Sequence, residues 1–163
     1  MTNSPKICKI MVKSGKKWRK KLAKREKRNN RFHKIDEKGR VAIPATLRRN
    51  LTFGERLVLT KGFEKCIYAF SEKEWKALMQ RIQDIPLVDE KKRNATRYIM
   101  GEAEEVEIDL QGRILLPGHL MEYAGITEEC YFVRMPRWFE IWNPEEYQKT
   151  VDRKNIDFEE LPI

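Results

Sequence analysis

A stretch of thirteen residues recurs 73 positions further along the chain, and this repeat constrains the fold more than any other feature. Residues 35–47 read IDEKGRVAIPATL, and residues 108–120 read IDLQGRILLPGHL. Each copy is followed by a short aromatic stretch and a helix start, at residues 67–75 and 140–147. Two copies are too few for a solenoid, in which many units stack in a row. The repeat therefore predicts one domain built as a pseudo-twofold pair of halves.

Each copy contains an Asp-x-x-Gly-Arg turn between two short apolar strands. Gly39 and its equivalent Gly112 supply the positive φ that a tight hairpin turn often needs. Asp36 and Arg40 are four residues apart across the first turn, so they can pair and hold its geometry. The residues given a structural role in the two turns are Asp36, Gly39, Asp109, Gly112 and Arg113.

Short helices and strands are predicted at equivalent places in the two copies. Pro44 and Pro117 stop the strand after each turn, because proline fixes φ and has no N–H to donate. The elements expected next are helices at residues 46–51 and 118–124, followed by strands at 57–60 and 130–134.

Two further helices are predicted between the halves. Apolar residues at helical spacing favour a helix over residues 72–85, Pro86 breaks it, and a second helix spans residues 90–100. Ser71 and Asn143 each precede a glutamate by three residues, which suits helix N-capping. Trp75, Trp138 and Trp142 are interpreted as anchors of the core or of a subunit interface. The predicted segments are a disordered basic tail at 1–30, a first repeat at 31–80, a helical linker at 81–103, a second repeat at 104–150 and a disordered acidic tail at 151–163.

The net charge of +9 belongs to the start of the chain. Residues 1–34 hold fourteen Lys or Arg and one acid, whereas the remaining residues carry a net charge of −4. Such a tail would attract phosphate backbones by counterion release, whatever the base sequence. It could equally be a solubilising extension, or Met11 could be the true initiator. A polyanion-binding tail would supply affinity without specificity.

Other classes of protein have little support in the sequence. Cys8, Cys66 and Cys130 are scattered singly, which argues against a disulfide framework and a zinc site and favours two semi-buried thiols and one in the tail. His33 and His119 lie far apart. No apolar run is long enough for a membrane span or a secretory signal, so we expect the chain to stay in the compartment where it is made. Neither a Gly-rich phosphate loop nor a nucleophile elbow occurs, and an enzyme, a cofactor or a small-molecule substrate is not expected.

The turn motif with the residues behind it resembles the AbrB family of swapped-hairpin DNA-binding barrels. Residues 34–49, KIDEKGRVAIPATLRR, carry that match. The two tandem copies, the segments 89–93 and 101–109, and the closing RWFEIW at 137–142 resemble the MraZ family in particular. The likeness covers roughly residues 31–150. It implies an α+β fold, a pseudo-twofold small β-barrel made of two hairpin/helix halves with flanking helices.

The resemblance also implies a function. Members of the MraZ family act on the promoter of the division and cell-wall gene cluster, as rings that lay successive subunits on repeated short boxes of double-stranded DNA. A homo-oligomeric, cytoplasmic and nucleoid-associated protein is therefore expected. Two features depart from the pattern: the basic extension before residue 31 is long, and the second copy has Gln111, Met121 and Glu122 where the first has Lys38, Arg48 and Arg49.

The first copy is accordingly the expected DNA-binding half. Its candidate residues are Lys34, Lys38, Arg40, Arg48 and Arg49. The lysines and Arg48 and Arg49 would contact phosphates and set the register, whereas Arg40 could bridge O6 and N7 of a guanine. The rival interpretation of Arg40 is a structural ion pair with Asp36. For Arg113 beside Asp109 the structural interpretation is preferred.

Two other functions stay open at this point. An RNA- or ribosome-binding module would act through residues 1–30. An antitoxin of the AbrB type would wrap a partner protein with its C-terminal segment, for which the acidic end at 152–163 is the only support.

Overall fold

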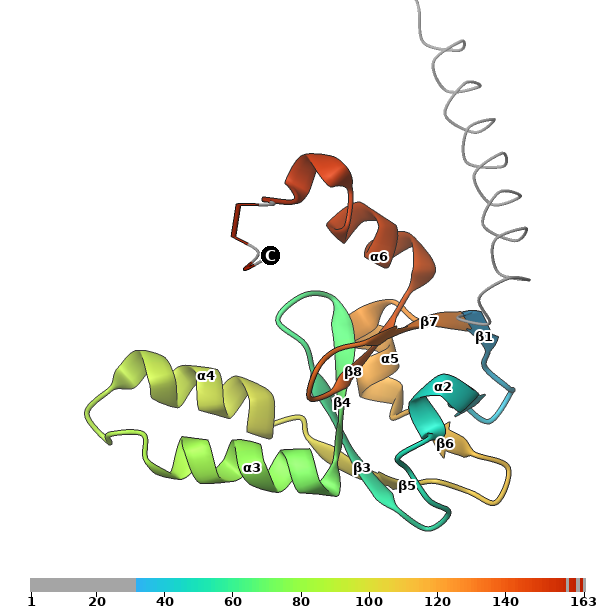
Figure 1. Ribbon diagram of the computed structural model, residues 1–163, viewed down its shortest axis with the longest axis horizontal. Coiled ribbons are helices and arrows are strands. Elements are labelled where there is room, and N and C mark those ends of the chain that lie inside the picture. Colours follow the sequence, from blue (N-terminus) through green and yellow to red (C-terminus); the bar gives the residue numbers. More distant parts are fainter. Residues whose placement is uncertain (1–31, 158, 161, 163) are drawn as a thin grey trace, which may run out of the picture. The chain divides into compact units, whose positions relative to one another are not determined.

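Two antiparallel sheets and the helices around them make up the part of the chain that the structure describes (Figure 1). The computed structural model describes residues 32–157, 159–160 and 162, so the expectations for the basic tail and Cys8 lie outside the described residues. The elements are β1 (Phe32–Lys34), β2 (Arg40–Ala42), α2 (Ala45–Arg48), β3 (Arg56–Lys61), β4 (Cys66–Ser71), α3 (Glu72–Gln83), α4 (Glu90–Met100), β5 (Glu104–Glu107), β6 (Arg113–Leu115), α5 (Gly118–Ala124), β7 (Glu129–Arg134), β8 (Phe139–Trp142), α6 (Pro144–Thr150) and the 3-10 helix η1 (Arg153–Asn155). The predicted α+β class is confirmed.

The two repeats exchange strands instead of each pairing within itself. The large sheet has the order β1-β7-β8-β4-β3-β5, and the small sheet consists of β2 and β6. The register of the small sheet is Arg40↔Leu115, Val41↔Ile114 and Ala42↔Arg113. A shift of 73 residues exchanges the two outer pairs of this register and maps the central pair onto itself. The same shift converts the β3–β5 pairing into the β7–β1 pairing. The strands beside each predicted turn therefore pair with the other repeat.

The central strands of the large sheet are buried on both faces. Side chains alternate along a strand, so Ile67 and Ala69 of β4 join one apolar cluster while Cys66, Tyr68 and Phe70 join a second. The first cluster includes buried aliphatic residues from both repeats, among them Leu120 of α5. The second contains Tyr131 and Trp142, with residues of α3 and α6 packed against it.

The cysteines are more buried than predicted, and three tryptophans pack where the sequence predicts. Cys66 and Cys130 are fully buried, not semi-buried as predicted, because each points from a strand into one of the two apolar clusters. Trp142 is a core residue, and Trp75 and Trp138 pack against the same cluster. These three tryptophans therefore belong to the packing of the fold, which is the first of the two predicted roles.

Most helix boundaries follow the sequence pattern. Helices α4 and α5 have the predicted bounds, and Ser71 and Asn143 are the N-caps of α3 and α6. Helix α3 ends at Gln83, two residues early, because the N–H of Ile85 bonds to Ile82 and Pro86 follows. Helix α2 is shorter than the predicted 46–51 and is a single turn that starts after Pro44.

The C-terminal segment beyond Asp152 was predicted to lack regular structure. The structure places one turn of 3-10 helix there, with the Asn155 N–H bonded to the Asp152 carbonyl at 2.8 Å. No helix in the described residues is long and apolar enough to cross a membrane.

The exchange of strands predicts that both repeats unfold together. Ile114 is 1% exposed and faces Val41 of the other repeat, whereas the adjacent Leu115 is 53% exposed. Ile114→Ala should lower the free energy of unfolding by about 2 to 5 kcal/mol. Denaturant titration followed by circular dichroism and by tryptophan fluorescence should give one coincident transition. Leu115→Ala is the matched control and should stay within about 0.5 kcal/mol of wild type; two separate transitions would show that the repeats fold independently.

Candidate nucleic-acid interface

The first turn is closed by a carboxylate that serves three donors. Oδ1 of Asp36 accepts the backbone N–H groups of Lys38 and Arg40, both at 2.9 Å. Oδ2 accepts Nε of Arg40 at 3.2 Å. Gly39 has φ +81°, as the turn requires. The predicted pairing of Asp36 with Arg40 is therefore present, and it is Nε that makes the bond.

The second turn has the same construction and touches the first. Asp109 accepts the backbone N–H groups of Gln111 and Arg113 and the Nε of Arg113, each at 2.9 Å. Gly112 has φ +73°. Nη1 of Arg113 also lies 3.9 Å from Oδ2 of Asp36. The pairing predicted for Arg113 is present, and the contact with Asp36 links the two turns.

Each turn is covered by a side chain from the helix of the other repeat. The Arg48 guanidinium lies on Gly112, where a Cβ would be 1.9 Å from Nη1, and Nη1 donates to the Gln111 carbonyl at 3.4 Å. Nε of Arg48 is buried and has no partner among the described residues. Met121, the equivalent of Arg48 in the second repeat, has its sulfur 3.9 Å from a Cβ built on Gly39. Arg48 is thus a packing residue of the second turn as well as a candidate DNA contact.

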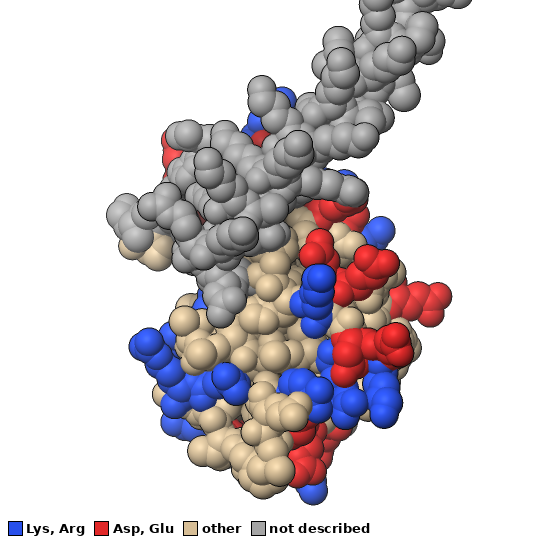
Figure 2. All heavy atoms as spheres, turned by 90° about the vertical axis from the view of Figure 1, so that its right-hand side faces the viewer, with Lys and Arg blue, Asp and Glu red and all other residues tan. Residues whose placement is uncertain are grey.

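The candidate basic residues fall into two groups. Lys38 and Arg40 belong to the first turn and the exposed Arg49 directly follows α2, on the side of the molecule that carries α2 and β6 in Figure 1. Figure 2 views that side and shows basic side chains gathered next to a group of acidic ones. Lys34 is exposed at the end of β1, where its register partner is the acidic Glu129 of β7. The structure therefore brings Lys38, Arg40, Arg48 and Arg49 near the paired turns and sets Lys34 on the large sheet.

The contact of Arg113 with Asp36 and the seat of Arg48 on Gly112 were not predicted. Both join residues more than 60 positions apart, and no local pattern in the sequence indicates either. No group of His, Cys, Asp or Glu in the described residues is arranged to hold a metal ion.

Comparison of the sequence with those of known proteins shows its family. The family model described as "MraZ protein, putative antitoxin-like" matches the chain twice, over residues 27–98 and 99–162. The chain belongs to the MraZ family. It is 40% identical over 129 residues to "Transcriptional regulator MraZ" of Caldanaerobacter subterraneus subsp. tengcongensis and to the protein of the same name from Thermoanaerobacter sp.. It is 36% identical to that of Acetivibrio thermocellus, and each of the three alignments covers 79% of this chain and 89% of the relative.

The duplicated family match corresponds to the two repeats of this MraZ chain. The two matched segments meet between residues 98 and 99, inside α4. The segment boundaries at 31, 81, 104 and 151 remain predictions.

The seat of Arg48 on Gly112 predicts unequal effects of two equivalent substitutions. Gly39→Ala and Gly112→Ala each force alanine into left-handed backbone, which costs about 1 to 2 kcal/mol. Gly112→Ala also expels Arg48 from the second turn, so it should lose about 1 kcal/mol more. The extra loss should vanish when Gly112→Ala is made in an Arg48→Ala background, as urea unfolding of the four variants can measure. Equal losses in both backgrounds would contradict this arrangement.

The turn carboxylates predict acid sensitivity. The backbone N–H of Arg40 holds the pKa of Asp36 below its ordinary 3.8, and the backbone N–H of Arg113 does the same for Asp109. The lowered pKa values mean that the turn stabilisation is complete above about pH 4. It is lost as pH falls through the folded-state pKa values. The unfolding midpoint of Asp36→Asn/Asp109→Asn should therefore depend less on pH below 4 than that of wild type.

Glu140 should show the opposite pH dependence of stability to the two turn aspartates. Burial raises the pKa of this carboxyl above its ordinary 4.5, although the indole N–H groups of Trp142 and Trp138 donate to it. Its contribution makes stability fall as pH rises through the window above 4.5. Glu140→Gln should remove that slope and leave the one below pH 4, and identical pH profiles of the two variants would refute both assignments.

Proposed function

We propose that this chain is a sequence-specific DNA-binding transcriptional regulator of the division and cell-wall gene cluster. It binds repeated promoter boxes as a ring, in the cytoplasm and in association with the nucleoid. The relatives are named transcriptional regulators, and the paired turns supply a rigid surface with basic residues around it. The observation that carries the proposal is the difference between the repeats. The Asp, Gly and Arg positions that close each turn are alike, whereas Lys38, Arg48 and Arg49 are replaced by Gln111, Met121 and Glu122 in the second copy.

The residues have separate roles in this proposal. Lys34, Lys38, Arg48 and Arg49 contact phosphates and set the register of the protein on the duplex. Arg40 reads a guanine through O6 and N7. Its ion pair with Asp36 is made by Nε, and this leaves the terminal nitrogens to form the two hydrogen bonds. The Arg48 guanidinium is held on the second turn. This contact fixes the direction from which the Arg48 side chain meets the DNA phosphates in the proposed complex.

The proposed assembly raises affinity by repetition. One basic turn per subunit makes a weak contact, but successive subunits of a ring meet successive boxes at high effective concentration. The exchange of strands fits a closed pseudo-twofold barrel, which we propose as the scaffold that holds the two turns together. The proposed function is binding, and the lowered pKa values of Asp36 and Asp109 are the wrong direction for either residue to serve as a general acid.

The decisive measurement is binding to a labelled fragment from upstream of the protein's own gene. Repeated boxes are compared with scrambled ones in a salt series, for wild type, a deletion of residues 1–30 and Arg40→Ala. Wild type and the deletion should prefer the boxes, and Arg40→Ala should lose about 1 to 3 kcal/mol of discrimination at one base position. Asp36→Asn is the matched control, since it weakens the turn and leaves Arg40 in place.

Two results would contradict the proposal. Equal binding to scrambled DNA, with a steep salt slope that disappears when residues 1–30 are deleted, would indicate non-specific binding of polyanions and favour the RNA or ribosome alternative. A loss of discrimination in Asp36→Asn as large as in Arg40→Ala would show that Arg40 acts by holding the turn.

A further inference from the structure

The small sheet of β2 and β6, here called the β2–β6 ribbon, has one buried face and one outer face. Val41 and Ile114 point inward to the first apolar cluster, so the residues on either side of them point outward. The outer face consists of the register pairs Arg40↔Leu115 and Ala42↔Arg113. Leu115 is 53% exposed. Each end of the ribbon therefore presents an arginine and an aliphatic side chain together.

Leu115 packs against the first turn, beside Arg40. A Cβ on Gly39 would lie 3.7 Å from Cδ1 of Leu115, so the leucine contacts the backbone of the turn. Directly opposite residues of an antiparallel pair have their Cβ atoms about 4.5 to 5.5 Å apart. Arg40 is tied to Asp36 through Nε. The arginine and the leucine thus stand next to each other on the ribbon, and each has a contact that limits its movement.

Such a pair of side chains matches the edges of bases in the major groove. A two-stranded ribbon fits this groove, where guanine presents O6 and N7 and thymine presents its C5 methyl group. With Arg40 on a guanine, a side chain about 5 Å away lies over the next one or two bases, since successive bases are about 3.4 Å apart. Leucine has no donor or acceptor. It gains contact with a methyl group, whereas on other base edges it displaces water from polar atoms without replacing their hydrogen bonds.

We propose that Leu115 is a specificity-determining residue, which contacts the C5 methyl group of a thymine within about two base steps of the guanine read by Arg40. The inference rests on the proposed function and adds a second base to those that the ribbon reads. The other end of the ribbon differs, because Ala42 has a short side chain and Nη1 of Arg113 lies 3.9 Å from Oδ2 of Asp36. The end with Arg40 and Leu115 therefore carries the readout.

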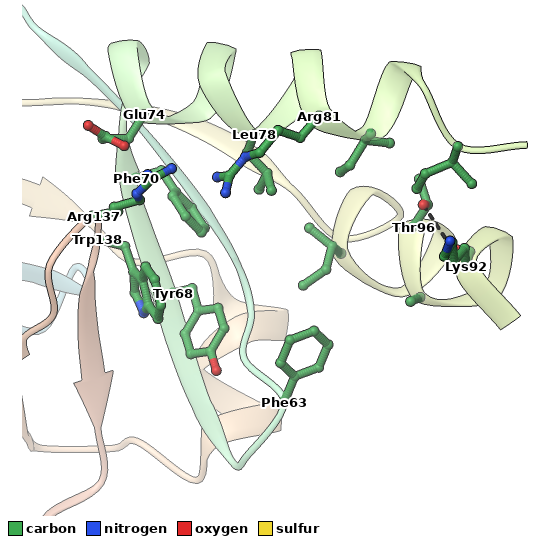
Figure 3. A pocket seen from close by; sticks show the side chains of 14 residues that line it. Phe63, Tyr68, Phe70, Glu74, Leu78, Arg81, Lys92, Thr96, Arg137 and Trp138 are labelled. Atoms are coloured by element: carbon green, nitrogen blue, oxygen red, sulfur yellow. Dashed lines mark hydrogen bonds between the residues drawn. The ribbon is translucent and has the colours of Figure 1, made fainter. Parts of the chain in front are cut away.

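The outer face of the ribbon is distinct from the apolar groove of about 510 Å³ between the large sheet and the α3–α4 helix pair (Figure 3). Tyr68, Phe70 and Trp138 line that groove and pack in the second apolar cluster, whereas the ribbon covers the first. Leu115 lines neither the groove nor the buried part of either cluster. Its truncation therefore removes surface and leaves the core in place.

The test is binding of the full chain to a labelled duplex from upstream of its own gene, in which each thymine of one box is replaced in turn by deoxyuridine. Uracil lacks the C5 methyl group and keeps the hydrogen-bonding groups of thymine. At one position wild type should lose affinity about fourfold, the effect of about one buried methylene-sized group. Leu115→Ala should bind the thymine and uracil duplexes equally at that position.

Two control variants isolate the methyl contact. Leu115→Met keeps an apolar side chain of similar volume and should retain the preference for thymine. Leu110→Ala removes the leucine of the second turn, which is 81% exposed and lies off the ribbon, and it should retain the preference as well. A merely structural role of Leu115 would weaken binding to both duplexes by the same factor in Leu115→Ala, so the ratio of the two affinities is the decisive quantity.

Two outcomes would overturn the inference and leave the proposed function standing. One is a wild type that prefers its boxes and loses no affinity at any uracil position. The other is a loss that persists in Leu115→Ala, which would mean that the methyl group acts through another residue or through the shape of the duplex. A wild type that binds boxes and scrambled DNA equally would instead count against the proposed function and the inference together.

Discussion

The pairing of β2 with β6 is the constraint on which the rest of the structure depends. Val41 and Ile114 face each other across the two repeats, and both are almost fully buried. Neither repeat can bury its central strand within itself, so the chain must bring together segments that lie 73 residues apart. The same exchange pairs β1 with β7 and β5 with β3, and it places the two Asp-Arg turns in contact through Arg113 and Asp36. The surface made by the two adjacent turns therefore forms only because the core pairs strands from both repeats.

This arrangement separates the residues that build the fold from those that give each half its chemistry. The aspartate, glycine and arginine of each turn make equivalent hydrogen bonds, with distances that agree to within 0.3 Å. Positions whose side chains make no bond within the turn differ instead. Lys38 and Gln111 are an example, because only their backbone N–H groups bond to the turn carboxylates. Arg48 and Met121 occupy equivalent positions of the two repeats, and each covers the turn of the other repeat. One carries a charged guanidinium and the other an uncharged thioether, so the same packing role is filled by different chemistry. The hydrogen bonds of the two turns are thus nearly symmetric, whereas the charges of the side chains around them differ between the repeats.

Much of the fold could be predicted because it depends on patterns among residues that are close in sequence. The positive φ of Gly39 and Gly112, the Asp-Arg pairs and the caps of α3 and α6 each involve residues at most four positions apart, and the repeat is visible as a direct match within the sequence. Helix α2 was predicted too long because the N–H of Leu51 bonds to the Arg48 carbonyl three residues back, so the chain turns after Arg48 and the helical pattern ends there. The seat of Arg48 and the groove of α3 and α4 could not be predicted, since they arise from contacts between distant segments. The closed barrel and the DNA-contacting role of the basic residues remain predictions.

The two roles considered for Arg40 are compatible once the geometry of the ion pair is known. Arginine has five N–H donors in a planar fork, and the bond to Asp36 uses the one on Nε. The pair therefore orients the guanidinium without engaging the terminal nitrogens, to which the proposed function assigns the base contact. Immobilising a long side chain on binding costs about 0.5 to 1.5 kcal/mol, and the bond to Asp36 reduces that cost for the proposed DNA complex. Arg113 is oriented in the same way by Asp109, but its Nη1 is directed at Asp36. The same pair that holds each turn thus leaves Arg40 better placed than Arg113 to read a base.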